Sequence, residues 1–356
     1  MHGGDWTSFE QKCGRMPLDF SANISPLGVP ESVKTAVIRA AGEADRYPDP
    51  SCRLLRDAIG KAENISPDQI LCGNGAADLI WRLAAVCRDG YALLPVPSFS
   101  EYRAALQANG CEICMYMMKE SDHFGLTSGF LPVLEEFTRS LPVSKQGIVF
   151  LCTPGNPSGV TIEQGLLLHI LAVCARRRII VVVDECFNDF LDDPESHTLK
   201  NYLTEYPNLV ILRAMTKIYA VAGIRIGYCF CADGELLVEM LDHGQPWSVS
   251  HLAQCAGIAA AADTEYRDGV RTLVRVERKK LQTGLRALGY RVIPGEANYL
   301  LFHSERMLSR LLWENGILIR DCSDYEGLSE GWYRAAVRTH EENRLLLHAL
   351  SEILNR

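Results

Sequence analysis

The most informative stretch of this 356-residue chain is MTKIYAVAGIRIGY, Met215 to Tyr228. It is mostly apolar, it follows the strand-like run Leu209 to Leu212, and it carries two cations, Lys217 and Arg225, eight residues apart. Burial penalises a charged ammonium, so a lysine in such a run loses its proton readily, and a neutral amine can attack a carbonyl to make a Schiff base. The alternative is a lysine whose stem only covers apolar surface.

The surrounding sequence predicts an α/β fold. Apolar runs alternate with amphipathic helical patterns, which indicates a large domain at residues 40–255 with a mostly parallel central sheet flanked by helices. Residues 1–39 and 256–356 predict a smaller α+β domain. The predicted strands are Ile70 to Cys72, Tyr91 to Val96, Gly147 to Thr153, Ile179 to Asp184, Leu209 to Met215, Tyr299 to Phe302, Ile317 to Ile319 and Tyr333 to Val337. The predicted helices include Leu166 to Arg176, Val270 to Leu288, and Glu341 to Ile353 with a capping box at Thr339 and Glu342.

Composition excludes several classes of partner. A net charge of -8 without a basic block argues against a nucleic-acid surface. No apolar segment approaches the ~18 residues of a membrane span, and the amino terminus does not look like an export signal. Thirteen cysteines, several of them inside apolar runs, indicate core residues of a cytoplasmic protein. The one C-x-x-C, Cys111 to Cys114, has no second pair or histidine cluster, so we expect no bound metal. The expected partners are small molecules.

Two motifs at predicted strand ends suit a phosphate and a flat ring. GNGAADL, Gly73 to Leu79, opens a helix, so the amides of Ala76 and Ala77 can hold an anion while Gly75 allows its close approach. A plain glycine turn is the alternative. PVPSFSEY places Phe99 and Tyr102 where an aromatic ring could stack on a flat cofactor, although core packing is the more common fate of such residues.

Polar residues follow other strands. The rigid turn TPGNPSG, Thr153 to Gly159, presents the amide of Asn156, which can donate to a phenolate oxygen or bond its own backbone. Asp184 follows five apolar residues, and such a carboxylate is costly unless it meets a cation, for example a protonated pyridine nitrogen, or caps a helix. Arg320 and Arg334 could bind carboxylate or phosphate, or form surface ion pairs. Ligands gather at the carboxyl ends of parallel strands, so we expect these groups to lie together.

Taken in order, Asn156, Asp184, Lys217 and Arg225 resemble the site of the fold-type I pyridoxal-phosphate enzymes, the aspartate aminotransferase superfamily, over nearly the whole chain. The resemblance implies pyridoxal 5'-phosphate bound covalently by Lys217, with Asp184 on the pyridine nitrogen and Asn156 on the ring hydroxyl. It implies further cofactor contacts from Gly75, Ala76, Ala77, Phe99, Thr216 and Arg225. It also implies a homodimer in which Tyr47 of RYPDP reaches the neighbouring subunit's cofactor phosphate.

Within that superfamily the chain looks most like the threonine-phosphate decarboxylases of cobalamin biosynthesis, relatives of the histidinol-phosphate aminotransferases. The shared segments include HGG at His2 to Gly4, DFSANISPLG at Asp19 to Gly28, and DECFNDF, in which Phe187 replaces a tyrosine common in the aminotransferases. The resemblance implies a lyase that converts O-phospho-L-threonine to aminopropanol phosphate and carbon dioxide. The residues it implies on the substrate's carboxylate and phosphate are His2, Gly3, Asn23, Asn156, Arg320 and Arg334.

Two alternatives stay open. Only the Cα bond that stands perpendicular to the pyridine ring breaks, so the same residues could serve an aminotransferase acting on a phosphorylated amino acid such as histidinol phosphate. Ala214 also stands where the family has a serine that binds the cofactor phosphate. That loss should weaken cofactor binding by ~1.5 to 3 kcal/mol, and it raises the hypothesis of a non-catalytic cofactor-binding homologue.

Overall fold

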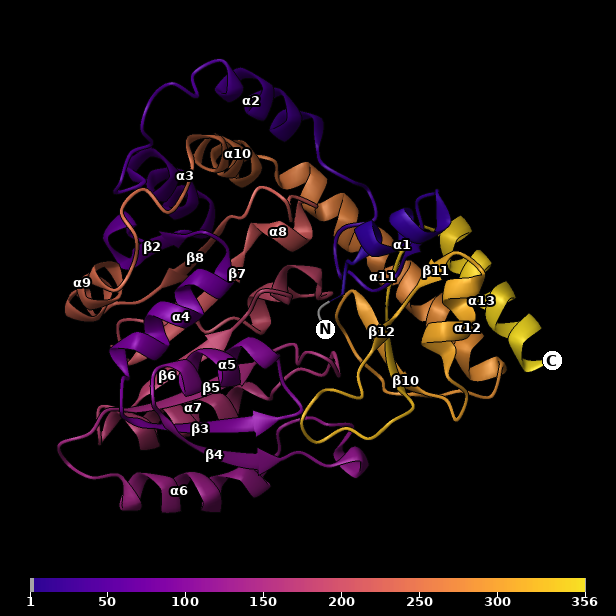
Figure 1. Cartoon of the computed structure of the whole chain (residues 1–356). Coiled ribbons are helices and arrows are strands. Elements are labelled where there is room, and N and C mark those ends of the chain that lie inside the picture. The colour runs from indigo at the N-terminus through magenta and orange to yellow at the C-terminus, as the bar shows by residue number, and fades with distance from the viewer. Residues whose placement is uncertain (1–2, 356) are drawn as a thin grey trace.

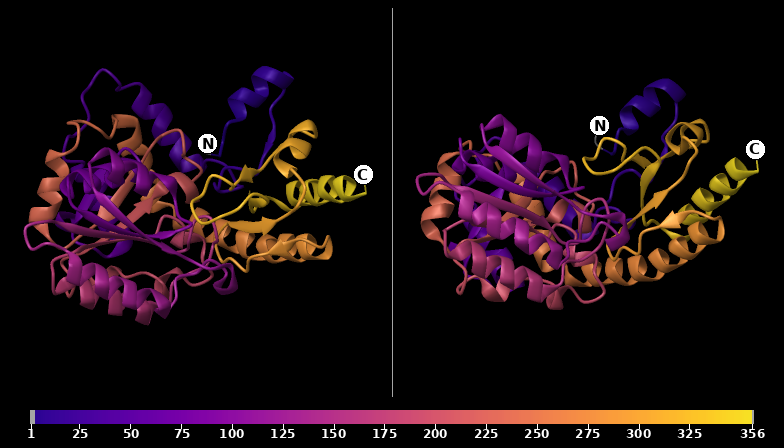
Figure 2. Two further views of the ribbon diagram at one scale, coloured as in Figure 1. Left: turned by 60° about the horizontal axis from the view of Figure 1, so that its bottom comes forward. Right: turned by 90° about the horizontal axis from the view of Figure 1, so that it is seen from below.

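The structure, a computed structural model, describes residues 3–355 as two bodies joined by the long helix α11, Thr264–Ala287 (Figure 1). The larger body is built on a seven-stranded sheet and the smaller one on a four-stranded sheet. Figure 2 shows α11 running alongside the smaller body. No helix among the described residues combines the length and apolarity that a membrane span needs.

The large sheet has the strand order β2-β8-β7-β6-β5-β3-β4. Its strands are β2 (Ile70–Gly73), β3 (Tyr91–Val96), β4 (Glu112–Met117), β5 (Gly147–Cys152), β6 (Ile180–Asp184), β7 (Leu209–Ala214) and β8 (Gly227–Phe230). Strands β4, β3, β5, β6 and β7 pair in parallel, and only β8 runs against its neighbours β7 and β2. The prediction of a mostly parallel sheet is confirmed.

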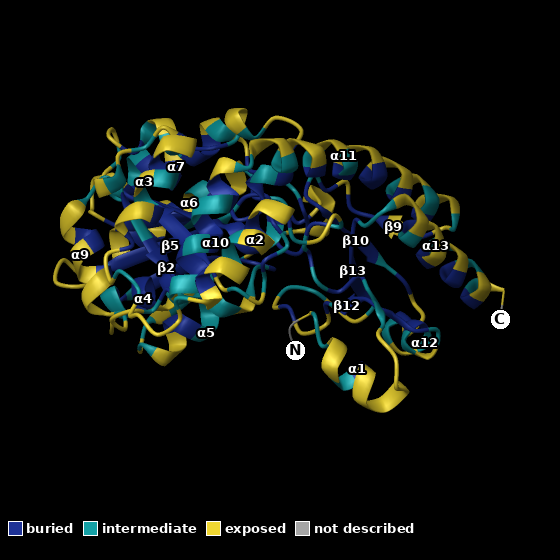
Figure 3. Cartoon of the chain, turned by 90° about the horizontal axis from the view of Figure 1, so that it is seen from above, coloured by how far each residue is buried: buried dark blue, intermediate teal, exposed yellow. Residues whose placement is uncertain are grey.

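Helices cover both faces of this sheet, so β6 and β7 are buried throughout and β5 is buried except at Cys152 (Figure 3). Every residue of β6, IVVVD, is buried, as expected for a β-branched strand covered on both sides. The helices of the larger body are α2 (Glu31–Ala41), α3 (Arg53–Glu63), α4 (Ala76–Val86), α5 (Ser100–Ala108), α6 (Leu131–Ser140), α7 (Gln164–Ala175), α8 (Met215–Ile218), α9 (Gly234–Asp242) and α10 (His251–Ala262). The predicted strand ending at Met215 is one residue too long, because Met215 begins α8.

The smaller body contains α1 (Trp6–Cys13), α12 (Leu308–Glu314), α13 (His340–Leu354), and the strands β1 (Leu18–Asp19), β9 (Arg291–Val292), β10 (Tyr299–His303), β11 (Ile317–Leu318), β12 (Arg320–Asp321) and β13 (Trp332–Ala336). The capping box of Thr339 and Glu342 is confirmed. Helix α11 begins six residues before the predicted Val270, because Asp263 caps it by accepting from the amide of Tyr266 at 3.1 Å.

The amino-terminal segment joins the smaller body through β1, which pairs in parallel with β11. Helix α2 instead packs on α10. We therefore propose that the larger domain extends beyond the expected 40–255 to include α2 and all of α10, with the change of domain at Asp263.

Candidate active site

The carboxyl ends of the central strands bring the predicted polar residues to one edge of the sheet. Cys152 at the end of β5 pairs with Asp184 at the end of β6, and Asp184 pairs with Leu212 of β7. Ala214 at the end of β7 pairs with Gly227, which also pairs with Gly73 at the end of β2. The expectation that these motifs converge is confirmed.

Lys217 lies in α8, immediately after β7, and its backbone carbonyl accepts from the amide of Ser25 at 2.8 Å. Burial lowers the pKa of Lys217, and the charges of Arg334 and Arg225 lower it further against the opposing effects of Cys186 and Asp184. Asp184 ends β6, which pairs with β7, and β7 leads directly into Lys217, so the two residues lie at the same edge of the sheet. Lys217 and Asp184 therefore share one site, and the amine is biased toward its neutral, nucleophilic form.

The carboxylate of Asp184 is buried and held on both oxygens. Its Oδ1 accepts from the amide of Cys186 at 2.9 Å, and its Oδ2 accepts from the hydroxyl of Tyr102 at 2.5 Å. The ring of Tyr102 is stacked on Phe150 with centroids 5.0 Å apart, and Phe99 lies edge-on to it at 5.7 Å. The sequence predicted ring stacking in this segment but not the hydroxyl contact with Asp184.

The start of α4 could hold an anion. Gly75 precedes this helix with φ 80°, and the first amides of a helix have no intrahelical acceptor. A Cβ on Gly75 would lie 2.5 Å from Nη2 of Arg225, so the guanidinium rests directly against the glycine. A Cβ on Gly227 would likewise lie 2.4 Å from the amide nitrogen of Ala76. The two glycines thus let the guanidinium of Arg225 and β8 approach the start of the helix closely, and helix-start amides beside a guanidinium fit a phosphate group.

Arg334 on β13 of the smaller body contacts Asn156 of the larger body. Its Nη1 donates to Oδ1 of Asn156 and, at 3.4 Å, to the hydroxyl of Tyr325. Its Nη2 donates to the carbonyl of Ser21 at 3.1 Å, and its guanidinium lies 5.4 Å from the ring centre of Tyr299. Its Nε is a buried donor without a partner among residues 3–355. An anion entering the site would meet a guanidinium already fixed in orientation.

Arg320 lies beside Arg334 in the strand register but is already paired. Its Nη2 binds both carboxylate oxygens of Asp324, at 2.7 and 2.8 Å, and its Nη1 donates to the carbonyl of Asp321 at 2.6 Å. The ion pair that the sequence left open for Arg320 is therefore present, and a substrate anion would have to share Arg320 with Asp324 or displace it.

The amino-terminal segment lies against the same site. A Cβ on Gly3 would lie 2.2 Å from the carbonyl oxygen of Ser21, the oxygen that binds Arg334. The amide of Gly4 donates to Oγ of Ser21 at 2.7 Å, and Oδ1 of the buried Asn23 has no partner in the described part of the chain. His2 lies outside the described residues.

The remaining predicted residues differ in their surroundings. Thr216 is buried beside Lys217, and the buried Ala214 offers no hydroxyl. Tyr47 is 82% exposed, and its ring contacts Trp247 at 4.9 Å.

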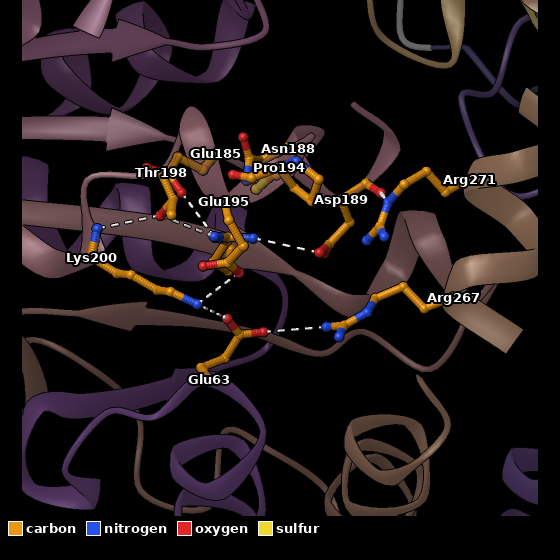
Figure 4. A network of polar contacts seen from close by, with 12 residues as sticks. Glu63, Glu185, Asn188, Asp189, Pro194, Glu195, Thr198, Lys200, Arg267 and Arg271 are labelled. Carbon is orange, nitrogen blue, oxygen red and sulfur yellow. Dashed lines mark hydrogen bonds and ion pairs between the residues drawn. The ribbon is translucent and has the colours of Figure 1, made fainter. Parts of the chain in front are cut away.

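A buried ionic network that begins directly after Asp184 in the sequence was not predicted (Figure 4). Glu185, the next residue, is fully buried and pairs with Arg213 at 2.9 Å, and Arg213 also lies 3.6 Å from Asp189. Glu63 of α3 pairs with Lys200 at 3.4 Å and with Arg267 of α11 at 3.5 Å. The sequence carries a signal for this network, because a charged residue ends each of two apolar strands. These residues are Glu185 in VVVDE and Arg213 in VILRA. The network ties α11 to the sheet at the base of the site.

The fold and site together define a class. A half-buried lysine with a lowered pKa, at the same sheet edge as a carboxylate and near a possible phosphate site, is typical of an enzyme that uses pyridoxal 5'-phosphate. The chain matches the model of the Aminotransferase class I and II family over residues 15–350 and belongs to that family. It is a pyridoxal-phosphate-dependent enzyme.

The chain is 37% identical to the threonine-phosphate decarboxylase of Salmonella typhimurium, covering 99% of this chain and 96% of that protein. It is 31% identical to the histidinol-phosphate aminotransferase of Symbiobacterium thermophilum, covering 93% of this chain and 89% of the other. The histidinol-phosphate aminotransferase of Sinorhizobium meliloti, solved in complex with pyridoxal-5'-phosphate, has the same fold with a TM-score of 0.85 and 21% identity, covering 98% of this chain and 94% of that one.

Proposed function

We propose that the enzyme decarboxylates O-phospho-L-threonine to aminopropanol phosphate and carbon dioxide. The observation that carries the proposal is the position of the amino-terminal segment. Gly3 of the HGG motif contacts Ser21 of the DFSAN motif, whose carbonyl binds Arg334. The two motifs that mark the resemblance to the decarboxylases thus lie at the site, and a full-length relative at 37% identity is a threonine-phosphate decarboxylase.

The cofactor, when bound, supplies an electron sink for the bond that breaks at the substrate Cα. We propose Lys217 as its covalent attachment and as the group that carries protons to and from Cα. Asp184, fixed by Tyr102 and Cys186, would keep the pyridine nitrogen protonated. The Nδ2 group of Asn156 is directed to the ring hydroxyl in this proposal, because its Oδ1 accepts from Arg334 and Tyr325. The proposed phosphate ligands are Gly75, Ala76, Ala77 and Arg225, with Phe99 on the ring and Thr216 nearby.

The substrate would be held at both ends by groups of the smaller body. Arg334 and Asn156 present donors to the carboxylate, and Arg320 with Gly3, Asn23 and the undescribed His2 would hold the phosphate. Phe187 packs edge-on against Tyr299, whose ring supports the guanidinium of Arg334. A phenyl ring here offers no hydroxyl, so this part of the site holds its ligand through the arginine and not through a tyrosine.

A second candidate, transamination of a phosphorylated amino acid such as histidinol phosphate, is supported by the relative at 31% identity. The same Lys217, Asn156 and Arg334 would serve it. The third hypothesis, a non-catalytic homologue, rests on Ala214, but it gives no reason for the lowered pKa of Lys217.

We propose that the enzyme is a homodimer in which Tyr47 completes the neighbouring subunit's site. Tyr47 is exposed, yet its loop is anchored, since Nε2 of Gln254 on α10 donates to the carbonyl of Asp49 at 2.9 Å. A fixed loop with an exposed tyrosine is suited to contact another chain.

Product analysis tests the activity. The purified holoenzyme is incubated with O-phospho-L-threonine, with and without 2-oxoglutarate. We expect carbon dioxide and aminopropanol phosphate in both cases, no product with Lys217→Ala, and normal turnover with the exposed control Lys279→Ala. Formation of glutamate without release of carbon dioxide would contradict the decarboxylase and support the aminotransferase.

A further inference from the structure

Tyr325 is a buried residue of the smaller body to which the sequence assigned no role. Its hydroxyl donates to Oδ1 of Asn156 at 3.3 Å and accepts from Nη1 of Arg334 at 3.4 Å, while Arg334 also donates to Oδ1 of Asn156. The three side chains therefore form a closed triangle of hydrogen bonds.

The triangle joins three separate segments. Asn156 follows β5 of the large sheet, Arg334 belongs to β13 of the small sheet, and Tyr325 lies in the loop between β12 and β13. The hydroxyl of Tyr325 thus stands at the junction of the two bodies.

The loop that carries Tyr325 is fastened to the larger body on the residues that follow. Glu326 pairs with Arg103 of α5 at 2.6 Å. A Cβ on Gly327, which has φ 87°, would lie 3.3 Å from the amide nitrogen of Pro97 after β3. Two neighbours of the tyrosine thus contact the larger body independently of its hydroxyl.

The surroundings keep that hydroxyl a donor. Burial raises the pKa of Tyr325, which outweighs the lowering by the charges of Arg334 and Arg320. The guanidinium of Arg320 lies 5.2 Å from its ring centre. With its single proton given to Oδ1 of Asn156, the tyrosine favours the amide orientation in which Nδ2 faces away from Arg334.

We infer that Tyr325 is a positioning residue that fixes the Asn156 amide and the Arg334 guanidinium, and thereby sets how the substrate carboxylate is oriented. The inference rests on the proposed function in that Arg334 and Asn156 hold a carboxylate. Orientation decides which Cα bond breaks, so Tyr325 would act on reaction specificity as well as on affinity.

Tyr325→Phe tests the inference, because it removes the hydroxyl and keeps the ring beneath Arg320. The matched control is Tyr333→Phe. Tyr333 is also buried, and its hydroxyl also makes two hydrogen bonds of 3.2 Å, from the amide of Leu308 and to the carbonyl of Arg306. Holoenzyme of each variant is titrated calorimetrically with 3-phosphooxybutanoate, which has the substrate's carboxylate and phosphate but no amine.

We expect Tyr325→Phe to bind this analogue about 5- to 10-fold more weakly, as for one lost hydrogen bond, and Tyr333→Phe to bind it within about twofold of wild type. With O-phospho-L-threonine, Tyr325→Phe should increase the share of whichever product, carbon dioxide or transferred amino group, is minor in the wild type. In an Asn156→Ala background, Tyr325→Phe should have a smaller effect than in the wild type, because only its contact with Arg334 remains.

Unchanged binding and product ratio in Tyr325→Phe would overturn the inference, as would equal losses in Tyr333→Phe or full additivity with Asn156→Ala. Failure of the proposed function is distinguishable, because a wild type that releases no carbon dioxide still allows the binding and additivity measurements.

Discussion

The hydroxyl of Tyr102 donates to Oδ2 of Asp184 across 2.5 Å in a fully buried contact. Burial and the neighbouring carboxylate raise the pKa of Tyr102 well above its ordinary value, so it remains a donor at neutral pH. The contact fixes the plane of the carboxylate that we propose for the cofactor's pyridine nitrogen.

Tyr102→Phe should weaken this arrangement without disturbing the ring stacked on Phe150. Losing one hydrogen bond to a charged group costs about 1.5 to 3 kcal/mol, so we expect kcat/KM to fall by about one to two orders of magnitude, with weaker cofactor binding. Steady-state kinetics and fluorescence titration of the apoenzyme with cofactor measure both. Tyr290→Phe is the control, since the buried hydroxyl of Tyr290 has no partner among the described residues. Equal behaviour of the two variants would contradict the role of Tyr102.

Arg334→Ala should chiefly raise the substrate concentration that the enzyme requires. Truncating a buried, hydrogen-bonded charge costs about 2 to 5 kcal/mol, which corresponds to roughly 30- to 5,000-fold in kcat/KM. Cofactor absorbance should be retained, because the arginine is proposed to hold substrate. Arg310→Ala, in which a 75% exposed side chain is removed, is the control. An unchanged KM in Arg334→Ala would show that Arg334 does not hold the substrate.

The reactivity of Lys217 should depend on the two arginines near it. Its lowered pKa keeps the amine neutral at a pH where an ordinary lysine is charged, so reductive methylation of the apoenzyme should reach Lys217 at lower pH than the exposed Lys279. Arg225→Gln removes a positive charge, which raises the pKa of Lys217. Its methylation should then occur at higher pH. Quantitative peptide mass spectrometry gives both profiles. Coincident profiles for the two lysines would show that the site does not tune Lys217.

Glu63 should make the protein acid-sensitive. Burial alone would raise the pKa of Glu63, but Arg213, Lys200 and Arg267 together lower it below its ordinary value. A carboxylate with a lowered folded-state pKa stabilises the fold above its unfolded-state pKa, and this stabilisation is lost as pH falls through the folded-state value. Glu63→Gln should therefore lower the free energy of unfolding by about 3 kcal/mol at pH 7 and by progressively less toward pH 3. Urea unfolding at several pH values tests this, with the exposed Glu135→Gln as control. A loss that does not shrink in acid would exclude the ionic mechanism.

The candidate site residues that could be predicted from the sequence are those at the ends of strands. Asn156, Asp184 and Lys217 each follow an apolar strand, and parallel strands place such residues at one edge. The hydrogen bonds from Tyr102 to Asp184 and from Tyr325 to Asn156 were not predicted. They join residues that are 82 and 169 positions apart in the sequence. The pairing of Arg320 with Asp324 has a local signal, an opposite charge four residues on, and agrees with the ion pair that the sequence left open.

The missed elements of the fold have a common cause. Strand β4 lies at the edge of the large sheet and is largely exposed, and its apolar run ICMYM overlaps the Cys111 to Cys114 segment, which was considered only as a possible metal motif. Strand β8 has only four residues and lies inside the segment already interpreted through Lys217. Both strands were missed because their residues had been interpreted through another motif.

The central claim is that Lys217 binds the cofactor covalently. Reduction of the holoenzyme with borohydride, followed by peptide mass spectrometry, tests it without any assumption about the substrate. We predict one pyridoxyl-phosphate adduct, located on Lys217 and lost in Lys217→Ala. An adduct on another lysine, or none in a protein that has retained its cofactor, would contradict the account.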